Sequence, residues 1–150
     1  MKKVLVGGCF NKIHYGHIKF LKEAKKLGDY LVVVLAHDKN NKKPYKVPAE
    51  IRKKNLEKLK IADKVIIGYE NDFKKTLENE MPNIIVLGYD QSLSKDLEDF
   101  AKKLKIKIVK MQKFGNYSTR DIISKKRDII YTCLFPILFL FLFLLPFFQL

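Results

Sequence analysis

The sequence predicts an α/β domain built on a doubly wound parallel sheet, and three observations support this fold class. Short apolar runs alternate with segments whose apolar residues recur at helical spacing. The run 30–36 contains five consecutive apolar residues, which is typical of a central parallel strand buried on both faces. Residues favoured at helix starts, namely Pro48, Asp72 and Ser94, precede three of the helical segments.

The expected elements follow one another in a regular order through the first 128 residues. Strands are expected at 3–7, 30–36, 63–67, 84–88 and 106–111. Helices are expected at 17–27, 48–60, 72–80 and 94–104, with a further helix beginning near 118. The fourth helix has apolar residues at the spacing i, i+3, i+4 and i+7, which indicates a face packed on the core. This alternation predicts a five-stranded Rossmann-like sheet with helices on both faces.

Charge divides the chain into two parts, which we expect to be a domain at 1–128 and a hydrophobic tail at 129–150. All 30 Lys and Arg residues and all 16 Asp and Glu residues precede position 129, so the domain carries the whole net charge of +14. A basic domain suits an anionic ligand such as a nucleotide. Arginine, which nucleic-acid recognition favours, occurs only at three positions, and the lysines are spread over every predicted helix. We therefore expect no nucleic-acid partner.

Cysteine usage and the start of the chain indicate the compartment. Cys9 and Cys133 are far apart and have neither metal-ligand spacing nor a disulfide framework. We expect no metal ion or prosthetic group bound by the protein itself. Met1 and two lysines lead into the first strand without the apolar stretch of a signal peptide. These features predict a cytoplasmic domain.

The tail at 129–150 has no charged residue in 22 positions. Its length permits a bilayer span, which needs ~20 apolar residues. Three basic residues at 125–127 precede it, as expected for a cytoplasmic domain with a C-terminal anchor, although Pro136 and Pro146 interrupt the helix. Two alternatives stay open: a reading-frame accident at the end of the gene, or packing against the domain or a dimer partner.

A glycine- and histidine-containing turn follows the first strand. It reads Gly7-Gly8-Cys9-Phe10-Asn11-Lys12-Ile13-His14-Tyr15-Gly16-His17 and leads into the first helix. Glycine lets backbone approach a phosphate, and the free N–H groups and positive dipole end of a helix favour an anion. The histidines can donate hydrogen bonds to phosphoryl oxygens. The alternative is that they only cap and pack the turn.

Four other polar segments are expected at the same edge of the sheet, because they follow strands or open helices there. The basic stretch 38–46, which includes Lys46, is either a mobile lid over phosphates or a solvated connector. Arg52 lies in the helix after it and is either a ligand-binding or an exposed residue. Asp90 follows the fourth strand, and Ser118 with Thr119 starts the last helix, where the hydroxyls can cap the helix, hold phosphates, or both.

The histidine turn resembles the signature of the HxGH nucleotidyltransferases, a cytidylyltransferase-like superfamily, written G-[ST]-F-D-x-x-H-x-G-H. It matches at five positions: Gly8, Phe10, His14, Gly16 and His17. It departs at Cys9, where the family has Thr or Ser, and at Asn11, where the family has Asp. The resemblance implies that His14 and His17 are catalytic and donate to the α-phosphate of a nucleoside triphosphate, while a phosphate-bearing acceptor attacks it and expels pyrophosphate.

Weaker matches extend the resemblance over residues 2–125. Glu50 to Leu56 resembles an E-x-R-x-x-x-L stretch of the family. The turn at Gly88 and Asp90 resembles its G-x-D turn, and the region of Ser118 resembles its I-S-[ST]-T-x-I segment. The expected nucleotide-binding residues are Gly8, Cys9, Phe10, Gly16, Lys46, Arg52, Gly88, Asp90, Tyr117, Ser118 and Thr119.

The acceptor depends on resemblance alone. Residues 82–91 are similar to the P-D-I-I-V-L-G-P-D-Q stretch of archaeal FAD synthases, which implies ATP and FMN as substrates, with Mg²⁺ or another divalent cation carried by the nucleotide. The alternatives are a cytidylyltransferase that uses CTP and glycerol 3-phosphate or a related lipid-head phosphate, and adenylyl transfer to phosphopantetheine or a sugar phosphate. A nucleotide-binding module without catalysis is the alternative of another class. Relatives are often dimers, so a homodimer is expected.

Overall fold

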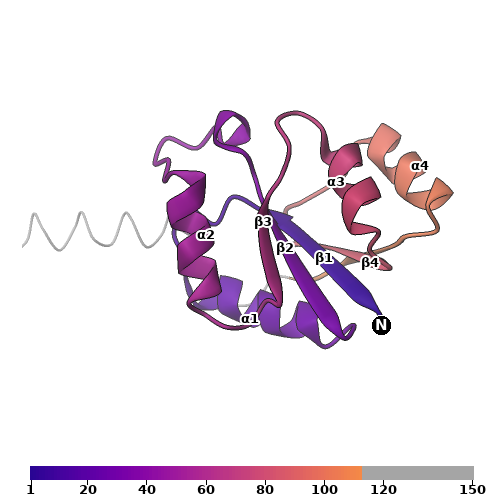
Figure 1. Cartoon of the computed structure of the whole chain (residues 1–150), viewed down its shortest axis with the longest axis horizontal. Coiled ribbons are helices and arrows are strands. Elements are labelled where there is room, and N and C mark those ends of the chain that lie inside the picture. Colours follow the sequence, from indigo (N-terminus) through magenta and orange to yellow (C-terminus); the bar gives the residue numbers. More distant parts are fainter. Residues whose placement is uncertain (113–150) are drawn as a thin grey trace, which may run out of the picture. The chain divides into compact units, whose positions relative to one another are not determined.

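The computed structural model describes residues 1–112, in which strands and helices alternate (Figure 1). The strands are β1 (Lys3–Gly8), β2 (Tyr30–Leu35), β3 (Lys64–Ile67), β4 (Ile84–Leu87) and β5 (Lys107–Lys110). The helices are α1 (Tyr15–Lys25), α2 (Ala49–Glu57), α3 (Phe73–Glu80) and α4 (Lys95–Lys103), with a short 3-10 helix, η1 (Asp38–Asn40), after β2. Every strand and helix predicted within this part of the chain is confirmed, with no end moved by more than three residues.

All neighbouring strands of the sheet are parallel, and their order is β3-β2-β1-β4-β5. β1 therefore lies between β2 and β4, and the direction of winding reverses beside it. In open sheets of this type, ligands bind outside the carboxyl ends of the strands at such a switch point. The histidine turn leaves the carboxyl end of β1, so the topology places it at that point.

The core has two halves, one on each face of the sheet. Val4 and Val6 pack with residues of α1 and α2, whereas Leu5 between them packs with residues of α3 and α4. Figure 1 shows the same division, with α1 and α2 on one side of the strands and α3 and α4 on the other. Apolar residues on both faces explain why β2 has no polar alternation.

The helix starts follow the predicted caps, with one difference at α1. The Asp72 carboxylate accepts from the Lys75 N–H at 3.0 Å, and the Ser94 hydroxyl accepts from the Leu97 N–H at 3.4 Å. α1 begins at Tyr15, two residues earlier than predicted, because the His14 carbonyl already accepts the first helical hydrogen bonds. His14 is therefore the N-cap residue.

Several predictions fall outside the described residues: the helix near 118 with Tyr117, Ser118 and Thr119, the boundary at 128, and the tail at 129–150. Within residues 1–112, no helix is long and apolar enough to cross a membrane. The homodimer and the membrane attachment stay predictions.

Candidate active site

The turn after β1 is built around Phe10. Its backbone has a φ of 49°, a left-handed conformation that non-glycine residues rarely adopt. A Cβ atom on Gly8 would lie 2.6 Å from Cε2 of the Phe10 ring, so a larger residue at that position would force the ring to move. The same ring lies 5.1 Å from the His17 imidazole, centroid to centroid. Gly8 and the strained backbone of Phe10 thus set where His17 lies.

The two histidines of the turn are in contact with each other. Their rings stack with centroids 3.8 Å apart and planes inclined by 29°. The Nδ1 atoms of His14 and His17 are both buried and have no hydrogen-bond partner among residues 1–112. Buried polar atoms are nearly always paired, so these two nitrogens without a partner are a departure from the usual pattern.

Burial lowers the pKa of both histidines. The pKa of His17 falls to about 4, chiefly through burial and then through the neighbouring His14. A hydrogen bond to the Lys12 backbone and the charge of Asp90 oppose this change only in part. The pKa of His14 is lowered by burial alone. Both imidazoles are therefore neutral at pH 7, and a phosphate bound beside them would raise their pKa values.

The low pKa of His17 predicts how stability depends on pH. Between pH 6.5 and about pH 4 the unfolded chain binds a proton at this residue and the folded chain does not. The free energy of unfolding should therefore fall as the pH falls through this window, and less steeply in His17→Gln than in the wild type. Urea denaturation at pH 7, 5.5 and 4.5 measures both slopes. Equal slopes in the two proteins would contradict the shift.

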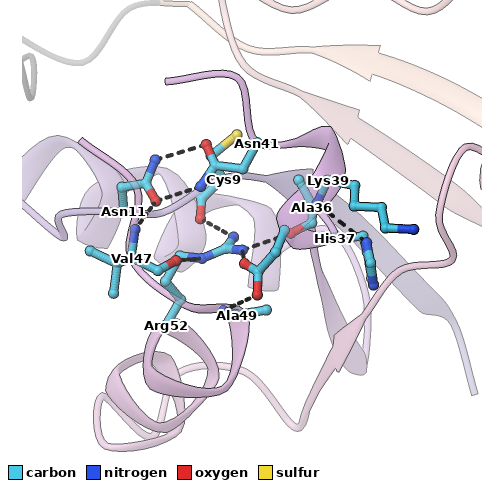
Figure 2. Close-up of polar contacts among 10 residues, drawn as sticks. Cys9, Asn11, Ala36, His37, Lys39, Asn41, Val47, Ala49 and Arg52 are labelled. Carbon is cyan, nitrogen blue, oxygen red and sulfur yellow. Dashed lines mark hydrogen bonds and ion pairs between the residues drawn. The ribbon is translucent and has the colours of Figure 1, made fainter. Parts of the chain in front are cut away.

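Arg52 does not lie on the surface of the site, because its side chain is fully buried. Nε donates to the Val47 carbonyl at 2.7 Å, and Nη1 donates to the Cys9 carbonyl at 2.7 Å. Nη2 donates to the Ala36 carbonyl at 2.9 Å and to Oδ1 of Asp38 at 2.7 Å (Figure 2). The guanidinium, expected to bind nucleotide, joins the turns after β1 and β2 to the start of α2.

Asp38 is the partner that sequence reasoning missed. Its second oxygen accepts from the Ala49 N–H at 3.1 Å and so caps α2. That hydrogen bond, and then the Arg52 guanidinium, hold the pKa of Asp38 below its usual value. The spacing of 14 residues between Asp38 and Arg52 gives no signal in the sequence.

Gln91 performs a similar role across the switch point. Its Nε2 donates to the Gly7 carbonyl at 2.9 Å, and its Oε1 accepts from the Gly88 N–H at 2.8 Å. The turn after β4, which carries Asp90, is thereby tied to the end of β1. Asp90 is exposed, and its charge acts on His17. The structure thus brings Asp90 and Gly88 to the histidine turn, as predicted.

A cavity of about 850 Å³ opens beside this turn, between the carboxyl ends of β2, β1 and β4 and the helices α3 and α4. Its lining includes Gly7, Gly8, Phe73, Leu87, Asp90 and Leu93. Its volume is within the range of small-molecule sites, roughly 300–1,000 Å³. The lining is mixed, with polar side chains such as Asp72, Asp90 and Gln91 beside the apolar ones.

The other predicted site residues lie in different places. Gly16 is in the first turn of α1, next to His17, and Lys46 is exposed in the basic stretch before α2. Cys9 has a free thiol, and its carbonyl is taken by Arg52. Within residues 1–112, no group of three or more His, Cys, Asp or Glu side chains is placed to hold a metal ion.

Paired histidines at a helix start, beside a switch-point cavity, define an α/β enzyme that acts on phosphoryl groups of a nucleotide. Residues 5–138 match the family model described as cytidylyltransferase-like. The chain belongs to this family of nucleotidyltransferases, as the histidine turn predicted.

Individual relatives agree with this assignment. The chain is 41% identical to an FAD synthase from Aciduliprofundum boonei over 137 residues, which cover 85% of this chain and 92% of the relative. It is 45% identical to an FAD synthase from Ferroglobus placidus over 75% of this chain and 77% of the relative. A crystal structure described as the lipopolysaccharide core biosynthesis protein of Thermoplasma volcanium superposes with a TM-score of 0.71 at 41% identity, covering 76% of this chain and 98% of that one.

Proposed function

We propose that this nucleotidyltransferase transfers the AMP portion of ATP to FMN, with formation of FAD and release of pyrophosphate. The observation that supports nucleotidyl transfer is the stacked pair His14 and His17 at the carboxyl end of β1. The relatives called FAD synthase, 41% and 45% identical over most of the chain, support the choice of FMN and ATP.

The reaction needs little proton transfer. The terminal phosphate of FMN is already an anion at pH 7, so it attacks without a general base. One of its oxygens forms a bond to the α-phosphorus of ATP, and the bond from that phosphorus to the bridging oxygen of the β-phosphate breaks. The protein positions the two anions and stabilises the charge that develops on the phosphoryl oxygens.

The histidines supply the donors at the α-phosphate. A neutral imidazole has one N–H, and both rings can bind a further proton once an anion lies beside them. His14 and His17 would donate to the non-bridging oxygens of the α-phosphate. The burial of His17 beside Phe10 would keep water away and strengthen its hydrogen bond.

The leaving pyrophosphate needs positive charge. Lys46 and its neighbours in the basic stretch, together with Ser118 and Thr119, would hold the β- and γ-phosphates. Mg²⁺ carried by the nucleotide would lie between the phosphates and neutralise the charge on the leaving group. Arg52 would act through the backbone that it holds and not through contact with the nucleotide.

The cavity beside Gly7 and Gly8 has room and chemistry for the flavin. Phe73, Leu93 and Leu97 give it apolar walls that suit a planar ring system. His14 and His17 do not line it, but Gly7 and Gly8 do, so the phosphate of FMN would have to extend along the turn after β1 to reach the histidines.

Pyrophosphate release with ATP or CTP, each against FMN, glycerol 3-phosphate and phosphopantetheine, tests the proposal. We expect release with ATP and FMN, with one FAD formed for each pyrophosphate. If pyrophosphate is released only with CTP and glycerol 3-phosphate, the protein is a cytidylyltransferase and the proposed FAD formation is wrong. Nucleotide binding without release from any pair would indicate a binding module.

A further inference from the structure

We propose that Asn11 and Asn41 form a matched amide pair that positions the basic segment, residues 42–46, beside the histidine turn for binding of the triphosphate. This inference rests on the proposed function. Asn11 lies in the turn between β1 and α1, three residues before His14. Asn41 follows η1 and immediately precedes the basic segment. The pair therefore joins the two parts of the chain that would contact the phosphates.

The two side chains exchange hydrogen bonds. Nδ2 of Asn11 donates to Oδ1 of Asn41 at 3.0 Å, and Nδ2 of Asn41 donates to Oδ1 of Asn11 at 2.7 Å (Figure 2). Oδ1 of Asn11 also accepts from the Val47 N–H at 3.1 Å. Because a backbone N–H can only donate, this contact fixes which atom of Asn11 is oxygen, and the reciprocal pairing then fixes Asn41.

The pair requires an amide at both positions. Asn41 is fully buried, so each of its polar atoms needs a partner inside the protein. A carboxylate at position 11 would accept from Asn41 and Val47 but would place an oxygen against Oδ1 of Asn41. The asparagine that stands where related signatures have aspartate is thus matched by an asparagine 30 residues away.

Both ends of the basic segment are fixed by the same cluster. Asn41 is held at its start, and at its end Val47 is held through both backbone groups, the N–H by Asn11 and the carbonyl by Arg52. Between these points, Lys42, Lys43 and Lys46 are exposed. Three cations are therefore presented on a short stretch whose ends are already ordered, which lowers the entropy lost when phosphates bind.

This arrangement predicts a particular kinetic effect. The hydrogen bonds of the amide pair join Asn11, Asn41 and Val47 and involve neither histidine, so breaking them should leave the chemical step unchanged. It should weaken ATP binding, because the lysines would then be ordered only on binding. Asn11 and Asn41 are positioning residues in this scheme, and the loss should be found in KM for ATP and not in kcat.

The test compares Asn11→Ala, Asn41→Ala and the double variant with the wild type. Each single variant should raise KM for ATP about tenfold with kcat within about twofold, the effect expected for one lost positioning contact. The double variant should be no worse than either single variant, because one substitution already breaks the pair. Trypsin should also cleave after Lys46 about tenfold faster in all three, because opening of the segment exposes the bond.

Asn83→Ala is the matched control. Asn83 accepts from the Lys3 N–H at 2.7 Å near the amino ends of β1 and β4, so this variant loses a side-chain hydrogen bond at an exposed position far from the segment. Asn11→Asp keeps the shape of the side chain and the two contacts in which it accepts but removes its donor, so it should raise KM for ATP by less than Asn11→Ala does. It also serves where an alanine variant does not fold.

Four results would overturn the inference: unchanged KM and cleavage in folded single variants, additive effects in the double variant, wild-type behaviour of Asn11→Asp, or an equal effect of Asn83→Ala. The cleavage assay needs no turnover, so it decides the role of the pair even where FAD formation fails. Failure of the proposed function would appear separately, as the absence of FAD with the wild type.

Discussion

His17→Ala should keep the fold and lower kcat by ~10²–10³, the usual cost of removing one donor to a developing phosphoryl charge. The imidazole stacks on His14 and borders Phe10, so its loss removes the donor and part of the packing around it. Neither the sheet nor the core residues of α1 depend on it. FAD formation under saturating ATP and FMN measures the effect, and circular dichroism with thermal melting verifies the fold.

Lys58→Ala is a suitable control for this experiment, because Lys58 is exposed at the far end of α2. Its turnover should equal that of the wild type. A folded His17→Ala protein with full activity would remove the histidine from the mechanism. An unfolded one would show that its role is to hold the turn together.

Arg52→Met should destabilise the protein by about 3–5 kcal/mol, because three carbonyls would lose their donor and each unsatisfied group costs about 1–3 kcal/mol. Three backbone carbonyls, those of Cys9, Ala36 and Val47, would lose their donors in a buried setting. The carboxylate of Asp38 is about half exposed and would stay solvated, so the carbonyls account for most of the cost. Urea denaturation at pH 7 gives the difference in the free energy of unfolding.

Arg52→Lys should recover less than half of that loss, because one ammonium group cannot reach carbonyls in three directions. Lys54→Met removes a charge from the exposed face of the same helix and should change stability by less than about 0.5 kcal/mol. A loss below 1 kcal/mol in Arg52→Met would mean that water or other donors replace the guanidinium, which would contradict the role assigned to it.

Local patterns in the sequence predicted the architecture because the information is local. The uninterrupted apolar run of β2 and the caps Asp72 and Ser94 are set by neighbours a few residues away. The histidine turn was equally accessible, since Gly8, His14 and His17 fall within ten residues at the end of a strand. The start of α1 was misplaced by two residues because Tyr15 and Gly16 have no apolar periodicity to mark it.

Contacts between distant segments could not be predicted in the same way. Arg52 was expected to face a nucleotide, but its direction depends on carbonyls from three separate turns that meet only in the folded chain. Asn11 looked like a departure from a signature until its partner, Asn41, was placed beside it. The bridging role of Gln91 could not be predicted either, because its partners are the Gly7 carbonyl in β1 and the Gly88 N–H in the turn after β4.

The fixed ends of the basic segment also limit how far it can travel. Five residues lie between the fixed residues Asn41 and Val47. Because an extended chain spans ~3.5 Å per residue, the middle residue can move only ~10 Å from the line that joins the two ends. The segment can therefore shift only a short way between its two fixed ends and cannot swing over the site as a lid would. Its length sets the reach of its lysines, so an insertion or deletion there would change which phosphate they meet without altering the histidines.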